Sequence, residues 1–219
     1  MRIKKLIVQT SALKDLTDFY IRLMELPASL SAEKELAIKI GSTELVFQQA
    51  TAAGPFYHFA INIPANKIED ARTWIRNRVD LVWIEQYQSD IADFVNWHAR
   101  SVYFYDPAGN ILELIARFDL DTKTSNPFSS GEFLSISEAG LVFPENELEK
   151  RTGNLLHQYP LSYFDKQPPL PQFKALGDDE GLLIIVPEGR NWFPTTRPAG
   201  IFPMKILFEN GDKKYELKV

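Results

Sequence analysis

The order strand, helix and three strands is predicted twice in the first half of this chain of 219 residues. Apolar and polar residues alternate over 3–10, a helical spacing of apolar residues follows over 12–24, and short alternating runs cover 26–49. The same order of patterns recurs over 55–118. A repeat of about 50 residues indicates a fold that is built from copies of one supersecondary unit.

The second half of the chain repeats this order less completely. A Ser-, Asn-, Pro- and Gly-rich segment at 121–131 reads as a linker, after which we predict a strand over 136–143 and a helix over 147–157. The chain ends in two alternating runs around Asn210-Gly211, a dipeptide typical of tight hairpins. The predicted division is a first half over 1–120 with units 3–50 and 55–118, and a degenerate second half over 132–219.

One stretch of the second unit, VYFYDPAGNILELIAR at 102–117, is the most specific in the sequence. Its residues 106–110 predict a hairpin turn between two apolar strands, and Glu113 places a carboxylate inside the second strand. With the upstream DFY at 18–20 and the repeated βαβββ order, this stretch resembles the vicinal oxygen chelate superfamily. That superfamily includes glyoxalase I, extradiol ring-cleaving dioxygenases, and the fosfomycin- and bleomycin-resistance proteins. The resemblance is clear in the first two units and looser in the second half.

The resemblance implies an α+β fold in which tandem βαβββ units form curled, cleft-bearing mixed sheets. It also implies a divalent metal in the cleft, bound by residues of the first and last strands of each unit. The corresponding positions in the first two units are Lys5, Glu44, His58 and Glu113. Three of them fit a metal site, whereas Lys5 departs from the pattern because a protonated amine has no lone pair to donate.

Strand periodicity supports a polar cleft independently of the resemblance. Alternate residues of a strand share one face, so each predicted strand has a polar face and an apolar face. The polar faces carry Lys5, Gln9, Glu44, Gln48, His58, Asn62 and Glu113. Such a mixture is typical of the lining of a ligand cavity, and we expect Lys5, Gln9, Gln48 and Asn62 to face the substrate.

The second half matches the pattern of metal-ligand positions less well than the first two units do. Its matching positions are Glu138 and Ile184, and an apolar residue at a ligand position argues against a metal there. Two segments lie beside the predicted strands: the polar loop with Trp97 and His98 before the hairpin, and the run RNWF at 190–193. Each could cover a cleft, and a solvated loop or a surface-anchored loop is the alternative reading.

Two functional hypotheses follow from these residues. The first is a metal-dependent lyase, isomerase or ring-cleaving dioxygenase that uses Fe, Zn, Mn or Ni, with His58, Glu113 and Glu44 as ligands and one of the carboxylates as a base. The second is a metal-free small-molecule binding or sequestering protein of the bleomycin-resistance kind, in which Lys5 lies between Glu44 and Glu113 as their counter-charge. The sequence leaves both open.

Composition narrows the range of partners. The formal net charge is −5 and no basic run occurs, which argues against a nucleic-acid partner. No apolar run reaches the ~18 residues of a membrane span, and the start of the chain has no signal-like apolar core. Because the chain also has no cysteine, we expect a cytoplasmic protein. We expect a small molecule as its partner, and either a monomer or a homodimer.

Overall fold

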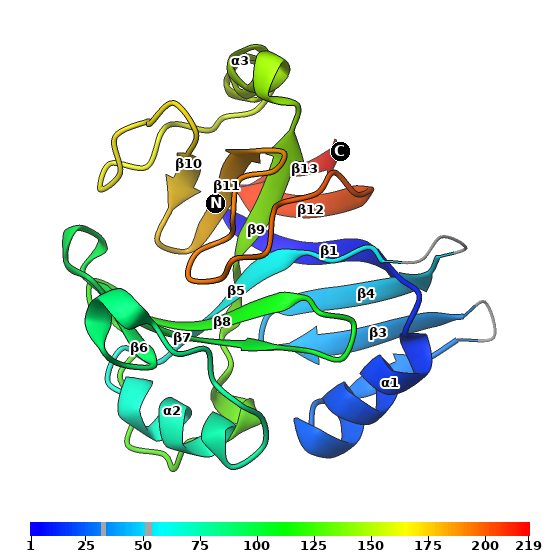
Figure 1. The fold of residues 1–219 in the computed structure, drawn as a ribbon, viewed down its shortest axis with the longest axis vertical. Helices are drawn as coiled ribbons and strands as arrows, with labels where there is room; N and C mark the ends of the chain where they lie inside the picture. Colours follow the sequence, from blue (N-terminus) through cyan, green and yellow to red (C-terminus); the bar gives the residue numbers. More distant parts are fainter. Residues whose placement is uncertain (32–33, 51–53) are drawn as a thin grey trace.

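Two mixed β-sheets form the centre of the protein, and helices pack against them (Figure 1). The computed structural model describes residues 1–31, 34–50 and 54–219. Residues 32–33, inside the first predicted unit, and 51–53, between the first two units, lie outside the described part of the chain. The first sheet has the strand order β13-β12-β1-β4-β3-β2, and the second has the order β10-β11-β9-β5-β8-β7-β6.

The elements follow one another with these bounds. The first sheet contains β1 (Arg2–Thr10), β2 (Ala28–Leu30), β3 (Glu35–Ile40), β4 (Thr43–Gln49), β12 (Met204–Asn210) and β13 (Lys213–Lys218). The second contains β5 (His58–Ile63), β6 (Ile91–Phe94), β7 (Ala99–Tyr105), β8 (Ile111–Arg117), β9 (Ser135–Phe143), β10 (Lys174–Asp178) and β11 (Gly181–Pro187). The longer helices are α1 (Leu13–Thr17) with its π-helical continuation η1 (Asp18–Leu23), α2 (Ile68–Arg76) and α3 (Leu148–Gln158). Within the described ranges, none of the helices has the length and apolar character needed to cross a membrane.

The units pair across the two halves of the chain. The second unit, β5 to β8, shares its sheet with β9, β10 and β11 through the antiparallel pair β5–β9. The first unit, β1 to β4, shares its sheet with the C-terminal hairpin through the pair β1–β12. We expected units 3–50 and 55–118 to face each other across one cleft; in the structure each of them instead shares a sheet with strands of 132–219. Because β5 is buried along its whole length, its backbone needs a strand partner at both edges, and β8 and β9 provide them.

One large hydrophobic core has members from both sheets and from the helices. The predicted alternation of buried residues holds in β3 of the first sheet, whereas β5, β8 and β11 of the second sheet are buried along their whole length. The members of the core include Leu6, Phe47, Phe59, Ile75 and Leu155, which come from both sheets, α2 and α3. Each such side chain contributes about 1.5–3 kcal/mol on burial, so the shared core holds the two sheets in one arrangement.

The predicted hairpin turn at 106–110 is present between β7 and β8. The carboxylate of Asp106 accepts hydrogen bonds from the backbone N–H groups of Ala108 (3.0 Å) and Asn110 (2.9 Å), and from the hydroxyl of Tyr20 (3.0 Å). Asn110 in turn accepts a hydrogen bond from the backbone N–H of Tyr57, at the start of β5 (2.8 Å). The turn therefore fixes the register of β8 against β5, and with it the position of Glu113.

Gly41→Ala is expected to destabilise the protein more than Gly211→Ala. Both glycines have a left-handed backbone, with φ of +54° and +59°. A Cβ at position 41 would lie 2.0 Å from the backbone oxygen of Leu134, whereas a Cβ at position 211 meets nothing within 4 Å. We expect the free energy of unfolding to fall by about 1–2 kcal/mol for Gly211→Ala and by about 3 kcal/mol or more for Gly41→Ala. Urea denaturation measures both, and equal losses would contradict the close packing at position 41.

Candidate metal-binding site

Three buried side chains that can bind a metal meet on one face of the second sheet. His58 begins β5, Glu113 lies in the middle of β8, and Glu138 lies in β9. Ala60, two residues after His58 on the same face, pairs with Glu113 on one side and with Glu138 on the other. The small side chain of Ala60 leaves the space between the two carboxylates open. One ligand atom from each of the three residues lies within 4.8 Å of the others.

His58 presents a lone pair to this group. Its Nδ1 is 3.1 Å from the backbone oxygen of Ile111, which can only accept a hydrogen bond, so Nδ1 carries the proton. Nε2 is then unprotonated and lies 3.7 Å from Oε2 of Glu113. Burial lowers the pKa of His58 to about 4, so the imidazole is neutral near pH 7. A neutral imidazole held by a backbone carbonyl is a common form of histidine in metal sites.

Glu113 and Glu138 place two buried carboxyl groups close together at the cavity. Burial, and next the charge of Glu138, raise the pKa of Glu113 to about 8, although a hydrogen bond from the hydroxyl of Ser101 opposes this. Burial also raises the pKa of Glu138, against the effect of the Arg117 guanidinium. Each carboxyl group is at most 3% exposed as a residue. A divalent cation would place positive charge beside both carboxyl groups, so the residues present fit such an ion.

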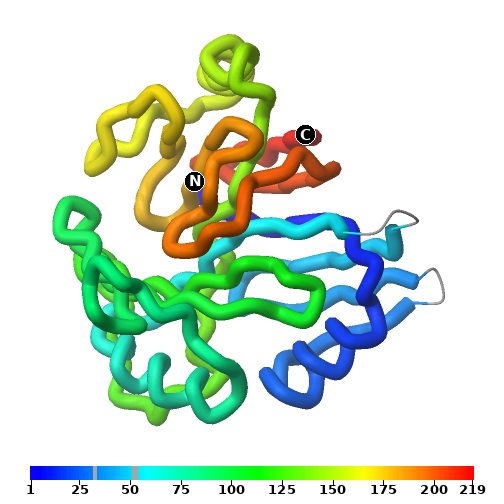
Figure 2. The backbone as a smooth tube through the Cα atoms, in the orientation of Figure 1, coloured from blue at the N-terminus to red at the C-terminus, as the bar shows by residue number. Residues whose placement is uncertain are grey.

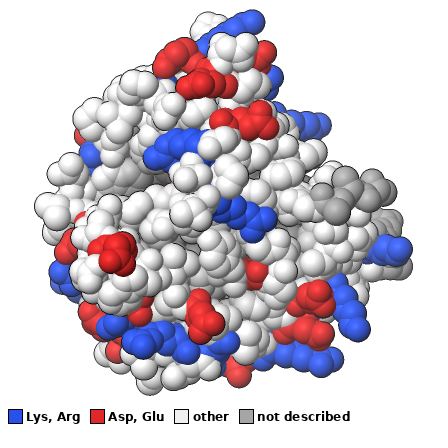
Figure 3. All heavy atoms as spheres, in the orientation of Figure 1, with Lys and Arg blue, Asp and Glu red and all other residues white. Residues whose placement is uncertain are grey.

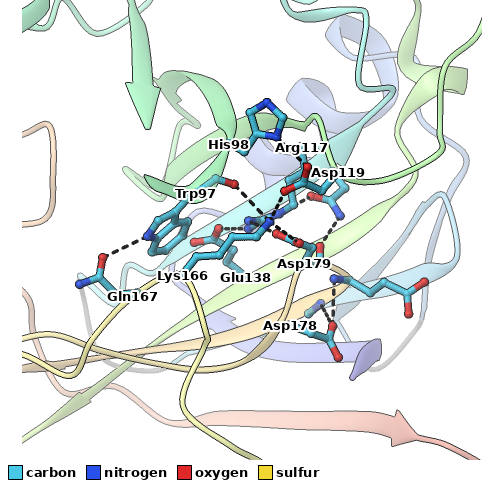
Figure 4. Close-up of polar contacts among 12 residues, drawn as sticks. Trp97, His98, Arg117, Asp119, Glu138, Lys166, Gln167, Asp178 and Asp179 are labelled. Carbon is cyan, nitrogen blue, oxygen red and sulfur yellow. Dashed lines mark hydrogen bonds and ion pairs between the residues drawn. The ribbon is translucent and has the colours of Figure 1, made fainter. Parts of the chain in front are cut away.

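A buried cation lies beside the site, and it belongs to Arg117. This residue is 1% exposed and lies four residues after Glu113 on the same face of β8. Its guanidinium donates to Glu138, to the side-chain oxygen of Asn62 (3.2 Å) and to Asp179 (3.3 Å). Figure 4 shows Arg117 next to Glu138, with Asp179 on its other side. Glu138 is therefore held by a fixed counter-charge, whereas Glu113 accepts a hydrogen bond from the neutral hydroxyl of Ser101 and has no Lys or Arg partner among the described residues.

The charged network continues from Arg117 to the surface. The amino group of Lys166 lies 2.6 Å from Asp179 and 2.8 Å from Asp119 (Figure 4). Asp119 also lies 2.6 Å from Nδ1 of His98, an exposed side chain. Positive and negative groups thus alternate from the buried site outward. This alternation compensates the cost of burying Arg117 and Glu138 away from water.

The three residues form the polar end of a cavity of about 270 Å³. Its walls are mostly aromatic, with the apolar side chains Phe94, Trp97, Tyr103, Leu170, Phe173, Ile184, Trp192 and Phe193. Figure 2 shows that the segments around residues 95 (green), 170 (yellow) and 190 (orange) approach one another beside the second sheet. Most charged side chains on this face lie toward its edges, and some Lys or Arg side chains lie nearer its centre (Figure 3).

The run 190–193 is a wall of the cavity rather than a surface-anchored loop. Trp192 is 4% exposed, and its ring centroid lies 5.0 Å from that of His58. Gly140 of β9 makes room for it, because a Cβ at that position would lie 2.6 Å from the Trp192 ring. Trp97 also lines the cavity and donates a hydrogen bond to Gln167 (3.0 Å). Both aromatic segments therefore contribute to the site.

Lys5 and Glu44 lie on the other sheet. They are direct neighbours on β1 and β4, and Nζ of Lys5 is 2.7 Å from Oε2 of Glu44. Both side chains are more than a third exposed. The expected position of Lys5 between Glu44 and Glu113 is wrong, because β1 pairs with β4 and β12, β4 pairs with β1 and β3, and β8 lies in the other sheet. The structure thus separates Lys5 and Glu44 from His58 and Glu113.

The remaining predicted cleft residues also divide between the two sheets. Gln9 and Gln48 are neighbours on β1 and β4 and line a shallow pocket on the first sheet. Asn62 lies in the second sheet, where its side chain donates to the backbone oxygen of Asp179 (3.0 Å) and accepts from Arg117. Asn62 therefore supports Arg117, and it is not among the residues that line the cavity.

Glu138 is absent from the ligands that the sequence predicts, and the structure brings it into the group. Glu138 occupies the same position in the first strand of the third unit as His58 does in the second, and this was the available signal. The apolar residue at the partner position, Ile184, argued against a metal in the second half. In the structure Ile184 only lines the cavity, because the pairing of β5 with β9 lets Glu138 join ligands of the second unit.

Solved structures with this arrangement of strands include two that match about nine-tenths of the chain. A putative dioxygenase from Bacillus subtilis subsp. subtilis str. 168 has a TM-score of 0.60 and 16% identity over 91% of this chain. A glyoxalase I mutant from Zea mays has a TM-score of 0.56 and 14% identity over 90% of this chain. The chain has the vicinal oxygen chelate fold. This confirms the expected α+β fold with curled mixed sheets.

The matches differ in length from this chain. The chain spans 65% of the length of the Bacillus subtilis structure and 70% of that of the Zea mays structure. No protein-family model and no curated protein matches the sequence. At these identities the similarity concerns the fold, so the chemistry of the site has to be argued from its own residues.

Glu113→Gln is expected to change how stability depends on pH in protein treated with a chelator. A raised carboxyl pKa means that the folded chain binds more protons than the unfolded chain, so stability falls as pH rises from the ordinary Glu range to about pH 8. Between about pH 7 and pH 8, where His58 and Asp106 no longer titrate, the free energy of unfolding of the wild type should fall by up to about 1 kcal/mol.

Urea denaturation at the two pH values measures this slope. The slope should be smaller in Glu113→Gln and unchanged in Glu44→Gln, a matched change of an exposed residue on the first sheet. An equal slope in the wild type and in Glu113→Gln would contradict the raised pKa.

Proposed function

We propose that this chain is a metal-dependent enzyme for a small-molecule substrate, in which His58, Glu113 and Glu138 hold one divalent metal. The observation that carries the proposal is the group of three buried ligand atoms within 4.8 Å of one another at the end of an aromatic cavity. The fold is shared with structures described as a putative dioxygenase and as glyoxalase I, which supports a lyase, isomerase or ring-cleaving dioxygenase.

The ligand set limits the kind of ion. One imidazole and two carboxylates suit Mn²⁺, Fe²⁺, Zn²⁺ or Ni²⁺. Ile184, at the fourth position of the pattern, offers no ligand atom, so oxygen atoms of the substrate can complete the coordination. When bound, such an ion polarises these oxygen atoms and stabilises the negative charge that develops on them.

The side chains of the chain itself have separate roles in this proposal. Ile111 holds the ring of His58 through Nδ1, and Arg117 holds Glu138, so both ligands are fixed before substrate enters. Glu113 would be a ligand of the ion, and a carboxylate that lines the cavity can also take a proton from the substrate. The aromatic walls exclude water and hold an apolar or planar substrate body.

Elemental analysis tests the metal directly. Protein purified without chelator is expected to contain about one divalent metal ion per chain, because three buried ligands suffice for a stable site. His58→Ala and Glu138→Gln should lose most of it, while Glu44→Gln should keep it, since Glu44 lies on the first sheet. A wild-type protein that remains metal-free after incubation with each of the four ions would refute the proposal.

A second candidate function is a metal-free binding protein, and the position of Arg117 favours it. Arg117 already supplies a positive charge to Glu138, the part that Lys5 was expected to play. With Glu113 protonated, the site would carry one buried ion pair and no net negative charge. The cavity would then sequester a ligand without chemistry.

Arg117→Gln distinguishes the two candidates. In the presence of chelator we expect it to lower the free energy of unfolding by about 3–5 kcal/mol, because it leaves Glu138 buried without a counter-charge. If the site binds a metal, added Mn²⁺ or Zn²⁺ should recover much of this loss. Arg100→Gln, which breaks an exposed pair with Asp93 in the same sheet, should cost less than about 1 kcal/mol and show no recovery. Thermal unfolding with and without metal measures both, and a loss that metal does not recover favours the binding protein.

A further inference from the structure

We propose that the ligand of the cavity is a small aromatic anion, and that Arg190 binds its anionic group. This inference depends on the proposed function for the location of the substrate, and it adds the chemical class of that substrate. The anionic group is a carboxylate or another planar oxyanion at one end of an aromatic body, and the end opposite to it faces His58, Glu113 and Glu138.

Arg190 brings a positive charge to the cavity lining. It follows β11, and among the described residues that line the cavity it is the one lysine or arginine. No carboxylate of the described residues lies within 4.0 Å of its guanidinium, in contrast to Arg117 beneath the same cavity. Its Nη1 donates to the backbone oxygen of Asn191 (3.3 Å), and its guanidinium lies 5.3 Å from the ring centroid of Phe173. Most of its five N–H donors are therefore available to a ligand.

The surroundings of Arg190 favour an interaction with a charged ligand. The residue is half-buried, and burial without a neighbouring acid lowers its pKa. A carboxylate that reached it would meet a partly desolvated guanidinium, where a paired hydrogen bond is stronger than at an open surface. The other arginine without an acidic partner in the described ranges, Arg197, stacks on Phe56 at 3.6 Å and donates to Gly109 (2.7 Å), outside the cavity. The guanidinium of Arg190 is thus available to a ligand in the cavity, whereas Arg197 has a structural role.

The carboxyl groups of the same cavity orient such a ligand. Glu113 and Glu138 line it together with Arg190 and disfavour a free anionic group of the ligand beside them. Tyr103 and Phe94 each lie 5.7 Å from Phe193, centroid to centroid, and form aromatic walls. A volume of about 270 Å³ is at the small end for ligand pockets and accommodates one or two fused rings. Charge and shape together select an aromatic body with one anionic end.

A pair of probes of equal shape tests the proposal. 2-Naphthoate and 2-naphthamide share one ring system and differ in the charge of the carboxyl-derived group. Titration calorimetry of chelator-treated protein excludes any contribution from a metal. We expect the wild type to bind naphthoate roughly tenfold or more tighter than naphthamide, as a charge-assisted pair of hydrogen bonds would give. Equal affinities, or binding of neither probe, would overturn the proposal.

Variants of Arg190 then locate the effect. Arg190→Gln should weaken naphthoate binding by about tenfold and leave naphthamide binding unchanged, which also shows that the cavity is intact. Arg190→Lys should retain part of the preference for naphthoate, because the charge remains. Arg22→Gln, an exposed control paired with Asp18 (3.2 Å), should bind both probes as the wild type does. Unchanged naphthoate binding in Arg190→Gln would show that the anion binds elsewhere.

The result of the probe-binding experiments can be distinguished from the result of the metal analysis. The metal content of Arg190→Gln should equal that of the wild type, because Arg190 is not a ligand. If the wild type binds no metal but prefers naphthoate through Arg190, the proposed enzyme fails and the ligand class holds. If it binds metal and does not distinguish the two probes, the metal site holds and the ligand class fails.

Discussion

The antiparallel pair β5–β9 is the contact on which the candidate site depends. It joins the second structural unit to the third and places Glu138 beside Ala60, opposite Glu113. Without this pair, His58 and Glu113 would have no third ligand within reach, and Arg117 would have no buried carboxylate to hold. It also positions β11, after which the chain supplies Arg190 and Trp192 to the cavity. One strand pairing thus determines the ligands, their counter-charge and one wall of the pocket.

The balance of buried charge explains why the site needs a further positive group. Two carboxyl groups and one guanidinium are buried here, and the imidazole beside them is neutral near pH 7. If both carboxyl groups were ionised, one negative charge would lack compensation, so the pKa of Glu113 rises and the group keeps its proton. Either a proton on Glu113 or a divalent cation beside it would remove the uncompensated negative charge. The proposed enzyme would bind the cation, and the alternative binding protein would keep the proton.

The sheet and the connecting segments contribute different parts of the site. The strands supply the polar end, where the geometry of the ligands is fixed by backbone pairing. The segments around Trp97, Phe173 and Trp192 supply the aromatic walls and Arg190. Segments of this kind vary more easily than strands, which is why one fold can hold many ligands. In this chain they line the cavity with aromatic side chains and add the guanidinium of Arg190.

The sequence by itself determined the repeated units, the turn at 106–110 and the face of the strand on which His58 and Glu113 lie. These features depend on local rules, because a period of two assigns each side chain to a face and Asp106 caps its own turn. Only the tertiary structure decided which units share a sheet. It brought Glu138 in and left Lys5 and Glu44 paired with each other on the first sheet. The physical reason is that every strand edge presents the same N–H and C=O groups, so the choice between partners depends on the shared core as a whole.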